Sequence, residues 1–158
     1  MIAVVILGGG LLAFATAFAQ GMFLMSSSHY HQIAKEKASE AIESVFTSRD
    51  TRIITWSRIR NVSQGGIFRD GAQPLRAPGN DGLVNTADDG AAENEILPGP
   101  DGLLGTGDDV VQPLDSFTRE MAITDIGPNL RQIRVIIRYR VSHVNRQYQL
   151  IAYISTFA

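Results

Sequence analysis

The first 28 residues of the chain carry no Asp, Glu, Lys or Arg, and three consecutive glycines interrupt a largely apolar run. An α-helix rises about 1.5 Å per residue, so roughly twenty such residues span the hydrocarbon core of a bilayer, about 30 Å thick. Residues 1–25 are therefore predicted to form a helix that lies in a membrane or among other apolar helices. No other feature of the sequence constrains the fold as strongly.

A cleaved secretory signal is the alternative for this segment. Ala17-Phe18-Ala19 has the small-x-small pattern of a cleavage site after an apolar stretch. Two observations favour a retained anchor instead. No Lys or Arg precedes the apolar run, and apolar residues resume at Met22–Met25, beyond the possible cut. We therefore expect an uncleaved transmembrane or filament-core helix.

Helical periodicity continues beyond the apolar segment to about Ser48. Apolar residues recur there at spacings of three and four and form one stripe. The stripe consists of Tyr30, Ile33, Ala34, Ala38, Ala41, Ile42, Val45 and Phe46. Charged residues lie on the opposite face: Lys35, Glu36, Lys37, Glu40 and Glu43. Residues 26–48 are therefore predicted to be an amphipathic continuation of the helix that packs against a folded domain.

Two segments twenty residues apart share the pattern P-G-x-D-G-L-x-x-T-x-D-D, with eight identities in twelve positions. The copies, residues 78–89 and 98–109, lie in a strongly acidic region. Between Gly79 and Asp109 there are eight acids and no Lys or Arg. An uncompensated block of carboxylates attracts cations. The alternative is a pair of exposed Asp-Gly turns whose acids only keep the loop soluble.

The chemistry of the repeat is that of a hard-cation loop. Ca²⁺ prefers six to eight oxygen ligands from carboxylates and backbone carbonyls, and Asp-Gly supplies a tight turn. The spacing is not that of an EF-hand. The second copy is the better candidate because Gly105 and Gly107 give its backbone more freedom. The candidate ligands are Asp101, Leu103, Gly105, Asp108 and Asp109 in the second copy, and Asp81, Asp88 and Asp89 in the first.

The C-terminal third has the alternation of β-strands. Strands are predicted over Phe117–Ile126, over Leu130–Val144 and over Gln147–Phe157, with turns at residues 127–129 and at Asn145-Arg146. One apolar face of this meander would lie on the amphipathic helix, which makes an α+β fold. The connecting region is less regular, with a short helix expected within residues 55–60 and a short strand at residues 67–68.

Three arginines, Arg134, Arg138 and Arg140, share the polar face of the second predicted strand. They could meet phosphate, but the one aromatic residue among them, Tyr139, falls on the opposite, apolar face of the strand and is not placed to stack on bases. We therefore do not expect nucleic-acid binding, and a DNA receptor remains the weakest alternative. A solvated outer face, or one that pairs with acidic loops or neighbouring subunits, explains the arginines more simply.

The absence of recognisable catalytic patterns leads us to expect no enzymatic activity. The chain has no cysteine, which excludes thiolate metal sites and cysteine nucleophiles. It has no G-x-S-x-G, H-E-x-x-H or phosphate-binding glycine loop. His29 and His31 are two residues apart on the predicted helix and cannot chelate as an i, i+4 pair would.

The whole arrangement resembles that of type IV pilins and pseudopilins. M-I-A-V-V-I-L at residues 1–7 looks like the continuation of the family's mature start, which reads F-T-L-I-E-V before an apolar run. Residues 118–139 are similar to a strand pair of minor pilins. G-P-D-G-L-L-G-T-G-D-D-V at residues 99–110 is similar to the calcium loop of major pseudopilins, which implies Asp101, Asp108 and Asp109 as side-chain ligands.

The chain departs from the family pattern in two respects. The leader peptide and the glutamate that neutralises a neighbouring N-terminal amine in the family would lie upstream of Met1, and we expect a start assigned too late. The apolar helix also lacks a proline, and the glycine triplet is expected to supply the same flexibility.

The resemblance implies a structural subunit of a type IV pilus or type II secretion-like filament, stabilised by Ca²⁺. Its partners would be other filament subunits, and prepilin processing with methylation would precede assembly. It would lie in the inner membrane first and in a periplasmic or cell-surface filament afterwards. The alternative is a membrane-anchored or secreted calcium-dependent binding or adhesion module that acts alone. The expected organisation is a core helix (1–25), its amphipathic continuation (26–48), a connecting region (49–76), the acidic repeat loop (77–111) and an antiparallel sheet (112–158).

Overall fold

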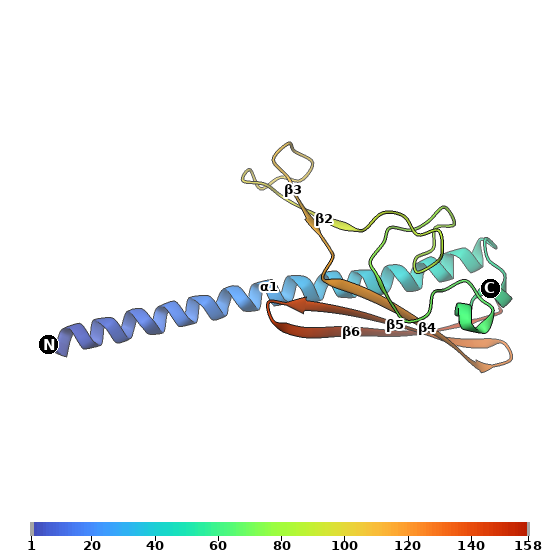
Figure 1. The fold of residues 1–158 in the computed structure, drawn as a ribbon, viewed down its shortest axis with the longest axis horizontal. Helices are drawn as coiled ribbons and strands as arrows, with labels where there is room; N and C mark the ends of the chain where they lie inside the picture. The colour runs from blue at the N-terminus through green and yellow to red at the C-terminus, as the bar shows by residue number, and fades with distance from the viewer. Residues whose placement is uncertain (1, 158) are drawn as a thin grey trace.

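One long helix and an antiparallel sheet make up the fold, which is α+β as predicted (Figure 1). The structure, a computed structural model, describes residues 2–157, without the side chains at positions 2, 4, 5, 23 and 26. Met1 and Ala158, the outer ends of the predicted ranges, lie outside the described residues. The elements are α1 (Ile2–Asp50), two 3₁₀ turns (Trp56–Arg58 and Val62–Gln64), β1 (Ala72–Pro74), β2 (Asn94–Leu97), β3 (Val110–Pro113), β4 (Phe117–Gly127), β5 (Leu130–Val141) and β6 (Val144–Ser155).

Helix α1 divides into a bare half and a packed half. Every side chain that the structure describes between residues 3 and 25 is exposed. The helix is long and apolar enough to cross a membrane, and its N-terminal half extends well beyond the rest of the molecule (Figure 1). The C-terminal half contacts β5 and β6. The apolar half is therefore left without cover by the chain itself.

The predicted amphipathic stripe is the face that packs on the sheet. Six of its members are buried in the core, and Tyr30 and Phe46 are partly buried against it. The buried six are Ile33, Ala34, Ala38, Ala41, Ile42 and Val45. Three of them are alanines, and a small side chain at these positions lets the helix lie close to the strands.

Four strands form the main sheet in the order β1-β4-β5-β6, and all neighbours are antiparallel. Strand β5 alternates as predicted: Ile133, Val135, Ile137, Tyr139 and Val141 are buried toward the helix. Arg134, Arg138 and Arg140 lie on the other face, which is partly or fully exposed. The sheet is thus apolar on the helix side and mostly polar on the outer side.

The last hairpin turns three residues earlier than predicted. Val141 pairs with Val144, and the turn is Ser142-His143, with Ser142 in the left-handed region at φ 54°. The expected turn residues Asn145 and Arg146 lie within β6 instead. The strand register that pairs Val141 with Val144 thus outweighs the turn preference of asparagine.

The central part of the chain also departs from the prediction. Residues 67–68 form no strand, and Phe68 makes only an isolated bridge with Asn61. The expected short helix is a single 3₁₀ turn at Trp56–Arg58. The short strand β1 and the two-stranded β2–β3 pair were not predicted. Each has only three or four residues, too few to carry a periodicity.

A stack of three aromatic rings joins the helix to the sheet. The ring of Phe117 on β4 lies between Tyr30 of α1 and Tyr139 of β5, with centroid distances of 5.4 Å on each side. The interplanar angles are 4° and 16°. Phe117 is therefore the packing centre at the end of the sheet from which the bare half of the helix departs.

We expect Phe117→Ala to lower the free energy of unfolding by about 3–5 kcal/mol, because it removes the middle ring of a buried stack. Phe117→Leu, which keeps most of the volume, should cost clearly less. Chemical denaturation of the full chain in detergent, followed by circular dichroism of the sheet, measures both. Equal losses for the two variants would mean that volume and ring packing at this site are unimportant.

Candidate functional site

The two copies of the repeat fold into the same backbone shape. Gly82 and Gly102 both have φ 72°, and the positions three residues later, Asn85 and Gly105, also take left-handed conformations at 67° and 86°. The N–H of each Asp-Gly glycine donates to the carbonyl three residues earlier, Gly79 or Gly99. The sequence repeat is therefore a structural repeat.

Carboxylates organise each loop from inside by accepting backbone and hydroxyl hydrogen bonds. In the second copy, Leu103 N–H donates to Asp101 (2.8 Å) and Gly105 N–H to Asp109 (2.7 Å). The Thr106 hydroxyl donates to Asp108 (2.6 Å). The first copy has the same three bonds, at 2.8, 2.9 and 2.8 Å, made by Asp81, Asp89 and Asp88. All six aspartates of the pattern thus shape their own loop.

Glycine is required where the loop closes. A side chain at Gly79 would collide with the carboxyl group of Asp88, and one at Gly99 would collide with that of Asp108. The second aspartate of each copy, Asp88 or Asp108, is therefore packed directly on the glycine near the start of the motif. This close approach explains why Pro-Gly stands at the start of both copies.

The two copies differ in their surroundings. In the first copy, Leu83 and Val84 are fully buried in the core. Asn85 is buried as well, and its backbone carbonyl accepts from Arg69 N–H (2.7 Å) while its side-chain amide donates to the Arg69 carbonyl (3.1 Å). The second copy instead closes the β2–β3 pair, which projects away from the sheet (Figure 1).

Two of the repeat carboxylates, those of Asp88 and Asp108, are stabilised in their charged form. Hydrogen bonds from the Thr86 and Thr106 hydroxyls hold the pKa values of Asp88 and Asp108 below their usual range. Within residues 2–157, none of the six repeat aspartates forms an ion pair with Lys, Arg or His. Asp101 adjoins Asp108, because its backbone N–H donates to the Asp108 carboxylate (3.3 Å), which also helps to lower the pKa of Asp108.

These loops partly fit a hard cation. The Leu103 carbonyl accepts from the Thr106 hydroxyl (3.3 Å), which in turn contacts Asp108, so three kinds of oxygen gather beside Asp101. Gly105, also a candidate ligand, contacts an aspartate through its N–H, which donates to Asp109. In residues 2–157, no three His, Cys, Asp or Glu side chains stand in a metal-binding arrangement. The carboxylates face backbone N–H groups, and binding Ca²⁺ would require some of them to turn.

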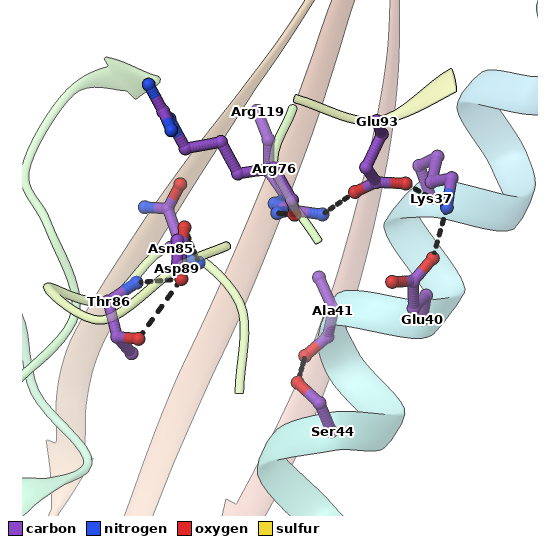
Figure 2. Close-up of polar contacts among 10 residues, drawn as sticks. All are labelled: Lys37, Glu40, Ala41, Ser44, Arg76, Asn85, Thr86, Asp89, Glu93 and Arg119. Atoms are coloured by element: carbon purple, nitrogen blue, oxygen red, sulfur yellow. Dashed lines mark hydrogen bonds and ion pairs between the residues drawn. The ribbon is translucent and has the colours of Figure 1, made fainter. Parts of the chain in front are cut away.

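Two of the eight acids in this region are compensated, contrary to the sequence expectation. Glu95 accepts from His29 of α1 (3.0 Å). Glu93 is nearly buried and lies between Lys37 of α1 and Arg119 of β4 (Figure 2). Because these two glutamates pair with the body of the protein, only the repeat aspartates remain as an unpaired acidic set.

Glu93 belongs to a buried ionic joint. Its carboxylate contacts the Lys37 ammonium and lies 3.7 Å from the fully buried guanidinium of Arg119, while Lys37 also reaches Glu40 at 2.7 Å (Figure 2). Burial lowers the pKa of Arg119, and the nearby carboxylates oppose this shift. Burial also acts to lower the pKa of Lys37. The bonds to Glu40 and Glu93 together outweigh this effect, so the net shift of the Lys37 pKa is upward.

Sequence reasoning did not find this joint. Lys37 was predicted on the polar helix face, and Arg119 stands in a strand that reads as ordinary alternation. The available signal was that Arg119 falls on the same face of its strand as Phe117 and Met121, where a buried apolar residue is expected. The joint fixes the base of the β2–β3 pair to both the helix and the sheet.

Comparison with known proteins adds no relative: no family model, no curated protein and no solved structure matches the chain.

We expect Glu93→Gln to lower the free energy of unfolding by about 3–5 kcal/mol, because it leaves a buried guanidinium without its counter-charge. Arg119 has no hydrogen-bond partner for Nε or Nη1 among residues 2–157, so the charge of Glu93 is its main compensation. Glu95→Gln, at a more exposed pair, should change stability by less than about 1 kcal/mol. Urea unfolding of both variants tests this, and a small effect of Glu93→Gln would contradict the joint.

Thr106→Val should raise the pKa of Asp108 toward its ordinary value of 3.8, because the hydroxyl hydrogen bond that stabilises its charged form is lost. Since the folded pKa of Asp108 is depressed, its contribution to stability is present above pH 3.8 and is lost as the pH falls through the folded value. Carboxyl-detected NMR titration measures the shift. Ser at the same position is the control and should keep the depressed pKa.

Proposed function

We propose that this protein is a structural subunit of a filament of the type IV pilus or type II secretion kind, which assembles through its N-terminal helix. The observation that carries the proposal is the continuous helix α1, whose bare apolar half extends from a domain packed only on its other half. Exposed apolar surface of this extent requires cover by lipid or by similar helices.

The helix suits both environments. At about 1.5 Å per residue, residues 2–25 extend roughly 36 Å, enough for a bilayer. Gly8, Gly9, Gly10 and Gly21 have open space around their Cα atoms in the single chain. Small residues let neighbouring helices approach closely, where packing rather than the hydrophobic effect drives association. The segment can therefore leave the membrane only for a bundle of equally apolar helices.

Ca²⁺ is proposed as a ligand of the repeat, first of all of the exposed second copy. Asp101, Asp108 and the Leu103 carbonyl would hold it, with Asp109 shaping the loop through its bond to Gly105. A bound divalent ion would relieve the repulsion between two adjoining carboxylates that lack a basic partner. Asp81, Asp88 and Asp89 offer a similar but less accessible set in the first copy.

The alternative is a calcium-dependent binding module that acts alone, either anchored by α1 or released after cleavage at Ala19. This module would bind Ca²⁺ in the same loops as the proposed filament subunit. The two proposals differ only in whether α1 packs against the helices of other subunits. Mass spectrometry of the protein recovered from membranes separates the two forms of this alternative, since cleavage would leave Gln20 as the first residue.

Assembly through the helix is tested with single cysteines, because the chain has none of its own. We expect Gly21→Cys in the full chain to form disulfide-linked oligomers in membranes. Adding Leu12→Glu should abolish them, because a charge at the centre of the apolar segment costs about 2.5–3.5 kcal/mol. Leu12→Ala is the matched control and should still cross-link. A chain that remains membrane-bound but never cross-links would favour the lone module.

Calcium binding is tested by calorimetry and thermal melting of the full chain in detergent. We expect Ca²⁺ to raise the melting temperature, because it binds the folded loop and not the unfolded chain. Asp101→Asn with Asp108→Asn should remove most of this rise, and Asp88→Asn a smaller part. Asp115→Asn, an exposed acid outside the repeat, should leave it unchanged. A rise that survives the double substitution would exclude the second copy as the site.

A further inference from the structure

The same two apolar positions of the repeat are buried in the first copy and exposed in the second. Leu83 and Val84 of the first copy are each 0% exposed. Their counterparts in the second copy, Leu103 and Leu104, are 62% and 65% exposed. One loop template thus packs against its own domain, while its duplicate presents an equivalent apolar pair to the outside.

The second copy is the tip of an arm, here defined as residues 94–113. The base of the arm is tied down: Glu95 pairs with His29, and Gln112 donates to the Tyr30 hydroxyl (3.0 Å). Farther out, Ile96 pairs with Val111 across the strands, and both are more than half exposed. The arm, which projects from the rest of the molecule in Figure 1, is therefore held in direction at its base. It is apolar along one face and at its tip.

We propose that this arm docks on a second copy of the same chain, at the basic end of the sheet where β4 begins and β5 turns into β6. This inference rests on the proposed function, because it requires that copies of the chain assemble. It assigns to the second repeat a contact between subunits, which the exposed helix alone does not predict.

The receiving surface is a hollow of about 580 Å³ whose charged lining residues are three arginines and one acid: Arg138, Arg140, Arg146 and Asp115. Gln147 lies in the same lining. Arg138 pairs with Glu120 (2.6 Å), whereas Arg140 and Arg146 have no acidic partner within residues 2–157. The arm tip has the opposite charge, since Asp101, Asp108 and Asp109 have no basic partners within residues 2–157. With Ca²⁺ bound, the three aspartates would still leave the tip with a net negative charge.

Charge disfavours the groove between α1 and the first repeat as the receiver. That groove, about 650 Å³, has Glu36, Glu40, Glu43 and Asp81 in its lining against Lys35 alone. An acidic tip would be repelled there, because like charges across an interface oppose association. A third hollow, also about 650 Å³, has Arg49 and Arg52 in its lining, but Arg49 already pairs with Asp50 (2.6 Å). The hollow at the start of β4 offers two arginines without an acidic partner within residues 2–157 and is therefore the site that we propose.

Docking of this kind is heterologous, since the arm of one copy meets a different surface on the next. A head-to-tail contact that does not close into a ring continues as an open helical array. The contact therefore suits a filament and not a symmetric dimer.

The test uses two differently tagged full chains expressed together in membranes. One carries Leu104→Cys at the arm tip and the other carries Gln147→Cys in the basic hollow. We expect a disulfide-linked heterodimer. Ile126→Cys, an exposed position at the far end of β4, replaces Gln147→Cys as the control and should give none. Gly21→Cys, measured in parallel, reports assembly through the helix.

Charge is tested on the same cross-link. Arg140→Glu with Arg146→Glu in the receiving chain should abolish the heterodimer, while Arg58→Glu, on an exposed 3₁₀ turn, should leave it intact. Three results would overturn this inference while leaving the filament proposal intact, provided that the helix cross-links form. The arm–hollow cross-link is absent, it is no stronger than with the Ile126→Cys control, or it persists after the charge reversal. Loss of both cross-links would overturn both.

Discussion

The division of helix α1 into a bare half and a packed half governs the rest of the structure. The packed half presents alanines and branched apolar residues to β5 and β6, and the core forms around that contact. The bare half continues the same helix without a break, so whatever covers it also sets the direction of the domain. Because one continuous helix joins the folded domain to the cover of its bare half, the position of one fixes the position of the other. The proposed filament subunit would require this coupling.

The buried joint of Lys37, Glu93 and Arg119 performs a related task for the acidic region (Figure 2). Burying charges is costly, and an apolar cluster of the same volume is often as stable. Ionic groups have a directional preference that apolar contacts lack. Here they connect the helix, strand β4 and the segment that leads into the β2–β3 arm, and so set the direction in which the arm leaves the domain.

The two copies of the acidic loop have the same shape but different surroundings. The first copy is bonded to residue 69 and contributes Leu83 and Val84 to the core. The second keeps the internal hydrogen bonds of its aspartates but has no domain surface beneath it. Since the aspartates shape each loop locally, the loop can be moved to a projecting arm without losing its form, and its apolar residues become available to another molecule.

Local sequence pattern was enough to predict several features: the uninterrupted helix, its apolar stripe, the alternation of β5, the turn after β4 and the equivalence of the two repeats. Each follows from spacing along the chain, which the backbone geometry converts directly into faces and turns. Features that depend on long-range pairing could be read only from the folded chain. The turn at Ser142 follows from the register of two strands. Glu93 and Glu95 each pair with a helix residue more than fifty positions away, and Glu93 also faces Arg119 of β4. The opposite burial of Leu83 and Leu103 depends on what surface lies beside each loop, which two copies of one pattern cannot encode.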